Sequence, residues 1–420
     1  MPAFAPLLPR PPIGTVLLGL LALILGATAC FAADPSPTGR SRAEVYHQVD
    51  AMAEVGQILF SDPALSASGR LSCASCHSPQ NAYGPPNGLA VQLGGPRMRS
   101  MGTRAVPSLR YLQAIPAFTE HFFESDDEGD DSIDNGPTGG LTWDGRVDRL
   151  RDQAKIPLLS PVEMANASPA AIVATVRAAP YADALRGAFG DSVFDHPDTT
   201  FNAILEALEV YQQRSASFYP YSSRYDAYLA GRATLSPAEQ HGLALFEDPA
   251  KGNCARCHVS RPDANGTPPQ FTDYGLVALG VPRNRTIAVN ADPDHYDLGL
   301  CGPDRTDMRT QPHYCGLFMT PTLRNVATRH SFFHNGVIHS LKEAIAFYVE
   351  RDTKPEKWYP PDADGKVHKF DDLWSAYVGN VEMDAPFGGQ PGDPPALSEA
   401  EIDDMVAFLR TLTDADQTSN

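Results

Sequence analysis

The sequence predicts a mainly α-helical protein that consists of two similar halves connected by long ordered loops. The first observation is an internal repeat: a helical pattern ends at Asp-Pro and leads into Cys-x-x-Cys-His, once within residues 43–77 and again within residues 235–258. The second is residues 397–412, a segment with capping residues at its start and apolar residues at helical spacing. The third is the content of 38 prolines and 33 glycines, which favours many loops between short helices.

Residues 1–33 are predicted to be an export signal. Arg10 is the one charged residue before an apolar run from Ile13 to Leu25, and small residues follow that run. The run is short and lies at the N-terminus, so no membrane span is expected in the mature chain. Two processing routes stay open: cleavage between Ala29 and Ala33, or lipid attachment at Cys30. Either route places the protein in the periplasm.

The repeat divides the mature chain into an N-terminal domain at residues 34–232 and a C-terminal domain at residues 233–420. Each domain is expected to close with a helix. In the C-terminal domain this helix lies within residues 397–412, and in the N-terminal domain its equivalent is expected at residues 201–212.

The charge distribution is strongly acidic. The formal net charge is −18, which argues against nucleic acid as a partner. A run of acidic residues at 125–134 is interpreted as a solvated loop. Calcium binding is the weaker alternative there, because the spacing matches no EF-hand pattern.

Both Cys-x-x-Cys-His motifs predict covalently attached c-type haem. Two thiols three positions apart can add to the two vinyl groups of one haem, and the adjacent histidine is then held as an iron ligand. A redox dithiol or half a zinc site would explain a single copy, but two copies make these alternatives remote. The predicted attachment cysteines and proximal histidines are Cys73, Cys76 and His77 for the first haem, and Cys254, Cys257 and His258 for the second.

Cys301 and Cys315 are the two cysteines that remain outside the signal and the haem motifs. In an oxidising compartment a leftover pair usually forms a disulfide, which here would close the polar loop of residues 302–314. Two independent buried thiols are the alternative, and the polar surroundings count against it.

Several further motifs resemble those of the bacterial di-haem cytochrome c peroxidases and their MauG-like relatives. These motifs are Trp-Asp-Gly-Arg at 143–146, Gln153, Pro-Val-Glu-Met at 161–164, Phe-Met-Thr-Pro-Thr-Leu-Arg-Asn-Val at 318–326 and Phe-His-Asn-Gly at 333–336. Together with the haem motifs, the resemblance covers nearly the whole mature chain. It implies two cytochrome c-like haem domains, of which the N-terminal one reacts with hydrogen peroxide and the C-terminal one stores or relays electrons.

The resemblance also implies the roles of individual residues. Trp143 is expected between the haems, and Gln153 and Glu163 are expected to line the peroxide pocket. A carboxylate such as Glu163 can take a proton from peroxide and return it to the leaving oxygen, which is worth roughly two to four decades in rate. Further residues implied to lie near the haems are Arg146, Arg324 and His334.

The first haem iron is expected to keep an open coordination position. Relatives that require reductive activation carry a second histidine on the loop after the first haem motif, whereas residues 78–120 contain none. Met98 and Met101 are the remaining candidates on that loop, and its arginine-rich sequence disfavours them as stable ligands.

Tyr348 is the position at which ordinary peroxidases of this family carry a methionine ligand and MauG carries a tyrosine. Methionine favours ferrous iron, whereas a phenolate is hard and anionic and favours ferric and higher states. Because the resemblance fixes this position, it implies that Tyr348 ligates the second haem. Met319 and Met308 are the rival ligands, and an ordinary core aromatic is the alternative interpretation of Tyr348.

The resemblance does not extend to the calcium site of the family. The positions that supply its ligands are Ala105, Arg329 and Ser331 in this chain. A guanidinium cannot ligate a hard cation, so calcium is not expected at that place, and Arg329 is expected to supply the positive charge instead. A calcium site built from inserted loops elsewhere stays open.

The function implied is that of a periplasmic enzyme that uses hydrogen peroxide to form a high-valent iron state shared by two haems. That state is expected to oxidise a residue on a partner protein, with tryptophan converted to kynurenine or a related product. Residues 297–303 are similar to the MbnH-type branch, whose members act on a companion copper-binding protein, so a small copper-binding protein is the expected partner. Trp358 and Trp374 are candidates for the electron route to it.

Two alternatives stay open. One is a di-haem cytochrome c peroxidase that reduces hydrogen peroxide with electrons from a donor protein, either a small cytochrome or a cupredoxin. The other is a di-haem electron carrier with no substrate of its own, which the open iron site and Glu163 disfavour.

Overall fold

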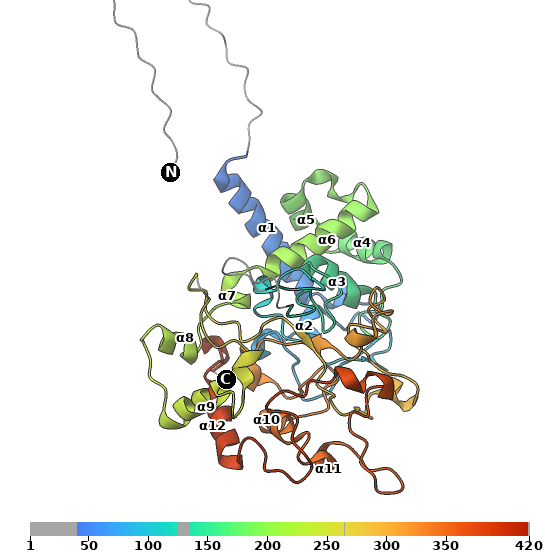
Figure 1. Ribbon diagram of the computed structural model, residues 1–420. Coiled ribbons are helices and arrows are strands. Elements are labelled where there is room, and N and C mark those ends of the chain that lie inside the picture. The colour runs from blue at the N-terminus through green and yellow to red at the C-terminus, as the bar shows by residue number, and fades with distance from the viewer. Residues whose placement is uncertain (1–39, 124–133, 264, 419–420) are drawn as a thin grey trace, which may run out of the picture. The chain divides into compact units, whose positions relative to one another are not determined.

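The computed structural model describes residues 40–123, 134–263 and 265–418 (Figure 1). The expected export signal and most of the acidic run at 125–134 lie outside the described residues. The chain divides into two compact units, Met1–Val45 and Tyr46–Asn420, and the second unit contains both Cys-x-x-Cys-His motifs. The domain boundaries expected from the sequence, at residues 34–232 and 233–420, stay a prediction.

The regular structure of the described residues is almost entirely helical, as predicted, with short 3-10 turns and long loops between the helices. The α-helices are α1 (Arg42–Ser61), α2 (Cys73–Cys76), α3 (Leu150–Leu159), α4 (Pro169–Ala178), α5 (Ala182–Phe189), α6 (Pro197–Gln212), α7 (Ser215–Phe218), α8 (Arg224–Leu229), α9 (Pro237–Glu247), α10 (Leu341–Glu350), α11 (Pro355–Trp358) and α12 (Glu399–Arg410). Two antiparallel strand pairs, each of two-residue strands, accompany them: β1 (Leu93–Gly94) with β2 (Ser100–Met101), and β3 (Leu276–Val277) with β4 (Phe318–Met319).

Helices α9 and α12 begin where their capping residues predict. The Ser236 hydroxyl accepts from the Glu239 N–H, and the Glu239 carboxylate accepts from the Ser236 N–H at 2.6 Å. Ser398 and Glu401 form the same reciprocal pair at the start of α12. Each box satisfies N–H groups that have no partner within the helix, so the sequence fixes these starts locally.

The internal repeat is visible as two equivalent helix crossings. A Cβ atom at Gly56 of α1 would lie 1.9 Å from the Ala207 carbonyl oxygen of α6, and a Cβ atom at Gly242 of α9 would lie 2.1 Å from the Asp404 carbonyl oxygen of α12. Only glycine permits such a close backbone approach. Four residues after each glycine a phenylalanine packs on an aromatic ring of the partner helix. These contacts are Phe60 on Tyr211 and Phe246 on Phe408.

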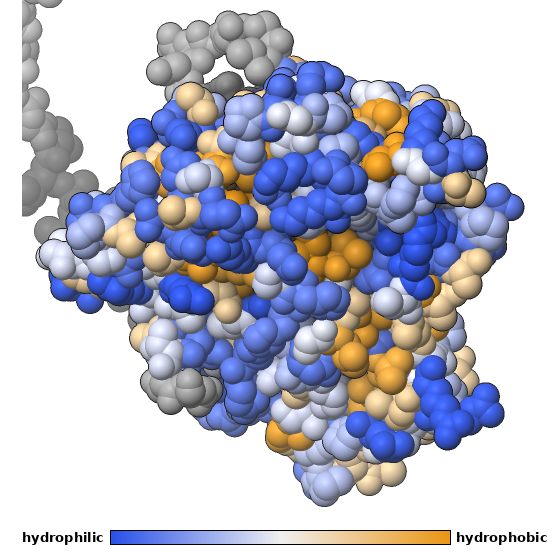
Figure 2. Space-filling view, turned by 90° about the horizontal axis from the view of Figure 1, so that it is seen from below, coloured by the Kyte–Doolittle hydropathy of each residue, from blue (hydrophilic) through white to orange (hydrophobic). Residues whose placement is uncertain are grey.

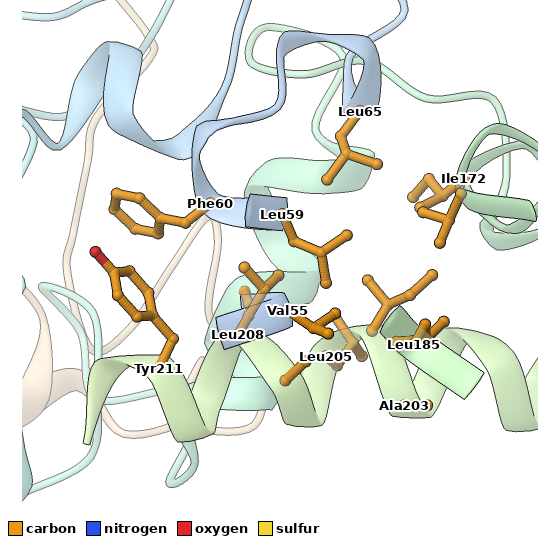
Figure 3. Close-up of a cluster of buried hydrophobic side chains, with 14 of the residues drawn as sticks. Val55, Leu59, Phe60, Leu65, Ile172, Leu185, Ala203, Leu205, Leu208 and Tyr211 are labelled. Atoms are coloured by element: carbon orange, nitrogen blue, oxygen red, sulfur yellow. The ribbon is translucent and has the colours of Figure 1, made fainter. Parts of the chain in front are cut away.

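Two large clusters of buried side chains surround these crossings. In the first, side chains of α1 and α6 point toward one another and meet Ile172 of α4 and Leu185 of α5 (Figure 3). The second lies around α9, α10 and α12 and includes Phe246, Phe347 and Phe408. Residues of the first cluster fall between 55 and 218 in the chain, and those of the second between 225 and 412.

A buried polar network connects the loop after the first haem motif to the C-terminal end of the chain. Arg110 and Tyr111 donate to the Asp414 carboxylate at 2.9 and 2.7 Å, and the Asn325 side chain donates to it at 2.7 Å. All four side chains are buried. Because a buried charge is tolerated only when it is paired, this network holds the 110–111 loop against the C-terminal segment.

The surface view in Figure 2 shows hydrophilic residues over most of this face, with apolar residues in separate patches. Across the described residues, no helix is both long enough and apolar enough to cross a membrane.

Candidate active site

A cavity of about 890 Å³ is lined by residues from both Cys-x-x-Cys-His motifs. The fold therefore brings together two motifs that lie far apart in the sequence. The motif residues in its wall are Cys73, Cys76, His77, Cys254, Cys257 and His258. Other residues of the wall belong to α3, β3, β4 and α10, so both halves of the chain contribute to one continuous site.

His77 follows the short helix α2 and is oriented by a backbone carbonyl. Its Nδ1 lies 3.2 Å from the Tyr83 oxygen. Because a carbonyl only accepts hydrogen bonds, Nδ1 carries the proton and Nε2 is free to bind a metal. Burial lowers the pKa of His77 to about 4, so the ring is neutral and can act as a ligand.

His258 repeats this arrangement in the second motif. Its Nδ1 lies 2.8 Å from the Phe271 oxygen, and burial lowers its pKa below the usual histidine range. The cysteines of both motifs have thiol pKa values raised by burial, to about 11 for Cys76. Each motif thus presents two thiols and a neutral imidazole to the cavity wall, which fits a covalently attached haem.

Glu163 is held at the cavity wall by the backbone around it. Its N–H donates to Ser160 at the end of α3, and its carbonyl accepts from Gly95 at 2.7 Å. A Cβ atom at Gly94 would lie 2.4 Å from the Val162 oxygen, so β1 packs directly on this turn. The residue lines the cavity with its side chain open to that space, and desolvation by the protein around it raises the pKa of its carboxyl above the usual glutamate range. A carboxyl with a raised pKa binds a proton more readily than an ordinary glutamate, which suits it to proton transfer.

Gln153 and Arg146 line the same cavity. Gln153 lies on α3, and Arg146 donates to Asp144 at 2.7 Å. Asp144 is fully buried and also accepts from Arg104 at 2.7 Å. Burial alone would raise the pKa of Asp144, but Arg104 and Arg146 hold it below its usual value. The carboxylate therefore stays charged and fixes both guanidiniums.

Trp143 is tied to both halves of the chain. Its indole N–H donates to the Ala105 oxygen at 2.8 Å, and its backbone oxygen accepts from Met319 of β4 at 2.9 Å. Trp143 lines the cavity together with the two haem motifs. The ring is therefore fixed at a point reached by segments from both halves.

Tyr348 of α10 is partly buried and lines the cavity. Its ring lies 5.9 Å from that of Phe333 and 5.5 Å from that of Phe387. Burial raises the pKa of Tyr348, and the nearby Cys254 and Cys257 add to this effect. A phenolate would therefore form at this position only against a compensating positive charge, such as that of ferric iron.

The methionines considered as ligands differ in their positions. Met319 lines the cavity, whereas Met98, Met101 and Met308 are not part of its described wall. Met405 of α12, which no sequence motif marked as a ligand, also lines the cavity, and its sulfur lies 4.0 Å from that of Cys254.

Arg324 and His334 both line the cavity. Arg324 donates to both carboxylate oxygens of Asp226 at 2.9 and 3.0 Å. His334 is buried and stacks on Phe318 with the ring centroids 3.6 Å apart, and its Nε2 has no hydrogen-bond partner among the described residues. A buried polar atom without a partner is uncommon in folded proteins.

Arg104 is a site residue that no sequence motif marked. It lines the cavity and pairs with Asp144 at 2.7 Å and with Asp297 at 2.6 Å. Asp297 is distant in sequence and lies shortly before Cys301, which forms the expected disulfide with Cys315. No local pattern reveals this ion pair, because its partners become neighbours only in the folded chain.

The two candidate tryptophans for electron transfer differ in exposure. Trp358 is partly buried against Phe347, with ring centroids 5.4 Å apart. Trp374 is 45% exposed and packs against Tyr296 and Tyr377 at centroid distances of 5.6 and 5.9 Å. The two residues that precede it in the sequence, 372 and 373, line the cavity.

No group of three or more histidine, cysteine, aspartate or glutamate side chains in the described ranges is arranged to hold a metal ion. Of the three positions at which the resemblance would place calcium ligands, Ala105 and Ser331 are buried and Arg329 lines the cavity.

Comparison with known proteins places this geometry in a family. A family model described as di-haem cytochrome c peroxidase matches residues 50–234. The chain is 36% identical over 384 residues to the methylamine utilization protein MauG of Paracoccus denitrificans, and the match covers 87% of this chain and 89% of the relative.

Solved structures show the same likeness. The di-haem peroxidase BthA of Burkholderia thailandensis matches with a TM-score of 0.76 and 41% identity, over 87% of this chain and 86% of that one. A MauG-like protein associated with microbial copper homeostasis matches with a TM-score of 0.60 and 26% identity, over 87% and 90% of the two chains. The chain therefore belongs to the di-haem cytochrome c peroxidase and MauG family, and it is a haem-dependent oxidoreductase with two c-type haems.

Proposed function

We propose that this protein is a periplasmic enzyme that uses the two oxidising equivalents of hydrogen peroxide to oxidise a residue, in our proposal a tryptophan, on a partner protein. The observation that carries the proposal is Tyr348, which lines the cavity beside Cys254 and Cys257. A phenolate ligand is anionic and favours oxidised iron, which suits a haem that stores oxidising equivalents.

Glu163 handles protons in this proposal. The haem supplies the iron at which hydrogen peroxide binds and is reduced. Glu163 would take a proton from hydrogen peroxide and return it to the oxygen that departs as water. Its raised pKa supports this role, because such a carboxyl holds a transferred proton more readily than an ordinary glutamate does. Gln153, in the same wall, orients the peroxide or a water molecule.

Trp143 is the proposed electron route between the two haems. Its indole N–H is fixed on Ala105 and its backbone on β4, so its ring has a defined position in the shared cavity. A fixed aromatic ring at this point allows both oxidising equivalents to be shared by the two halves of the site.

Trp374 is the proposed exit for oxidising equivalents. It is partly exposed, it packs against Tyr296 and Tyr377, and it follows cavity-lining residues in the sequence. An exposed aromatic cluster of this kind can pass electrons from a docked protein toward the haem site. The protein substrate is proposed to be a small exported metal-binding protein.

The test uses ferric holoprotein and no added reductant. Hydrogen peroxide is added in stoichiometric amounts, and the absorbance of the oxidised protein is followed with and without a candidate small exported metal-binding protein. We expect the absorbance of the oxidised protein to decay faster when the metal-binding protein is present. Peptide mass spectra are expected to show oxygen added to a tryptophan of that metal-binding protein. A much faster oxidation of reduced cytochrome c, with no change in any protein tryptophan, would instead identify an ordinary peroxidase.

A further inference from the structure

Arg329 differs from the other arginines that line the haem cavity. Five arginines among the described residues line it, and four of them pair with carboxylates of this chain. These pairs are Arg104 with Asp144 and Asp297, Arg146 with Asp144, Arg256 with Asp384, and Arg324 with Asp226. Within the described ranges, Arg329 forms no ion pair, and its hydrogen bonds go to uncharged oxygens.

The contacts of Arg329 fix its guanidinium near the first haem motif. Its Nε donates to the Ser331 oxygen at 3.2 Å and its Nη2 to the Val106 oxygen at 3.1 Å. A Cβ atom at Gly84, on the loop after His77, would lie 4.0 Å from Nη1. The side chain is partly exposed and lines the cavity, so part of its polar surface remains available to a bound group.

A positive charge in such a position is stabilised by an anion. Burial lowers the pKa of Arg329 to about 10, so the guanidinium still carries its charge at neutral pH. A partly buried guanidinium is stabilised when a carboxylate or phosphate accepts its hydrogen bonds, and backbone oxygens alone compensate the charge poorly. No carboxylate of the described chain does this for Arg329, so a bound group is the natural source of the anion. Haem c brings two propionate carboxylates, and a planar guanidinium matches a carboxylate in two parallel hydrogen bonds.

Arg329 is also linked to the proximal ligand of the first haem. It holds the oxygen of Val106, and the next carbonyl in the chain, that of Pro107, faces the ring of His77. The residue before, Ala105, accepts the Trp143 indole N–H. Residues 105–107 therefore connect Arg329, Trp143 and His77 through a short piece of backbone.

We propose that Arg329 binds a propionate of the haem attached at Cys73 and Cys76, and that it positions His77 through the Val106–Pro107 backbone. The guanidinium then acts as a fixed cation of the chain at the first haem. A fixed positive charge favours the reduced, less positive state of a nearby iron, so Arg329 raises the reduction potential of the first haem relative to a neutral residue. The inference rests on the two haems of the family and is independent of the protein substrate proposed above.

The test replaces the charge and leaves the rest of the cavity unchanged. We compare Arg329→Gln, Arg329→Lys and, as a control, Arg285→Gln, which removes a 62% exposed guanidinium paired with Asp371. Spectroelectrochemical titration of the holoproteins measures the potential of each haem. We expect Arg329→Gln to lower the reduction equilibrium constant of the first haem about tenfold, which is about 59 mV for a one-electron couple. We expect the first-haem potential of Arg329→Lys to stay close to that of the wild type, and that of Arg285→Gln to equal it.

A second measurement identifies the anion. In redox difference infrared spectra of protein grown with haem precursor labelled at the propionate carboxyls, we expect the labelled carboxylate band to move in Arg329→Gln and to stay in Arg285→Gln. Wild-type potential and an unmoved band in Arg329→Gln would overturn the proposal.

If Arg329→Gln does not retain the first haem, the Arg329→Lys variant tests whether a cation is required at this position. Two haems per chain and a near-wild-type potential in Arg329→Lys support the requirement for a cation. Loss of the first haem from Arg329→Lys as well would contradict the proposal. A lowered first-haem potential in Arg329→Lys, with the labelled carboxylate band at its wild-type position, would contradict it too.

Discussion

Replacing Glu163 by glutamine tests the proton-transfer role most directly. The substitution keeps the size of the side chain and removes the group that can take a proton from hydrogen peroxide. A positioned acid–base group contributes roughly two to four decades in rate, so we expect Glu163→Gln to slow the reaction of ferric protein with peroxide about 10² to 10⁴-fold. This loss corresponds to about 3 to 5 kcal/mol of activation free energy.

The pH dependence gives a second, independent signature. Glu163 must be ionised to accept the peroxide proton, and burial raises the pKa of its carboxyl. The wild-type rate is therefore expected to fall as the pH decreases through a value above the usual glutamate range. The glutamine variant is expected to lose this dependence, because it has no group that titrates there.

The assay is stopped-flow absorbance of ferric holoprotein mixed with excess peroxide, over a series of pH values. Asp152→Asn is the matched control, because Asp152 is a carboxylate on α3 that lies outside the described cavity wall. Its rate and pH profile are expected to equal those of the wild type. A Glu163→Gln protein with the wild-type rate and pH profile would refute the proposed role of this carboxyl.

Tyr348→Met is expected to leave the reaction of peroxide at the first haem unchanged but to abolish the long-lived oxidised state. An oxidised state that lasts as long as in the wild type, followed by stopped-flow absorbance, would contradict this expectation. The resting ferric protein is expected to contain one high-spin haem without prior reduction, because residues 78–120 contain no second histidine; an electron paramagnetic resonance spectrum with low-spin haem alone would exclude it. Gly242→Ala is expected to cost about 1 to 3 kcal/mol of stability in thermal unfolding, since its Cβ would meet the Asp404 oxygen at 2.1 Å. Gly187→Ala, with open space around its Cβ, is expected to be neutral or stabilising, and equal effects of both alanines would disprove the close crossing.

Much of this protein is determined by local sequence. The haem motifs specify their chemistry within five residues, because attachment requires only two thiols at fixed spacing and an adjacent imidazole. The starts of α9 and α12 are likewise specified by serine and glutamate three residues apart, since these side chains satisfy the free N–H groups of the first turn. The helix that closes the first half was expected at residues 201–212, and α6 spans Pro197–Gln212.

Tertiary structure alone decided how the site is assembled. Arg104 and Asp297 form an ion pair across 193 residues, and Trp143 meets Ala105 across 38, so neither contact leaves a local signal. The sequence could propose that Arg329 carries a charge near the haems, but only the fold shows that the other cavity arginines have carboxylate partners and Arg329 has none in the described chain. The physical reason is that local motifs record bonds made within a few residues, whereas the compensation of a buried charge depends on whatever the folded chain brings within a few ångströms.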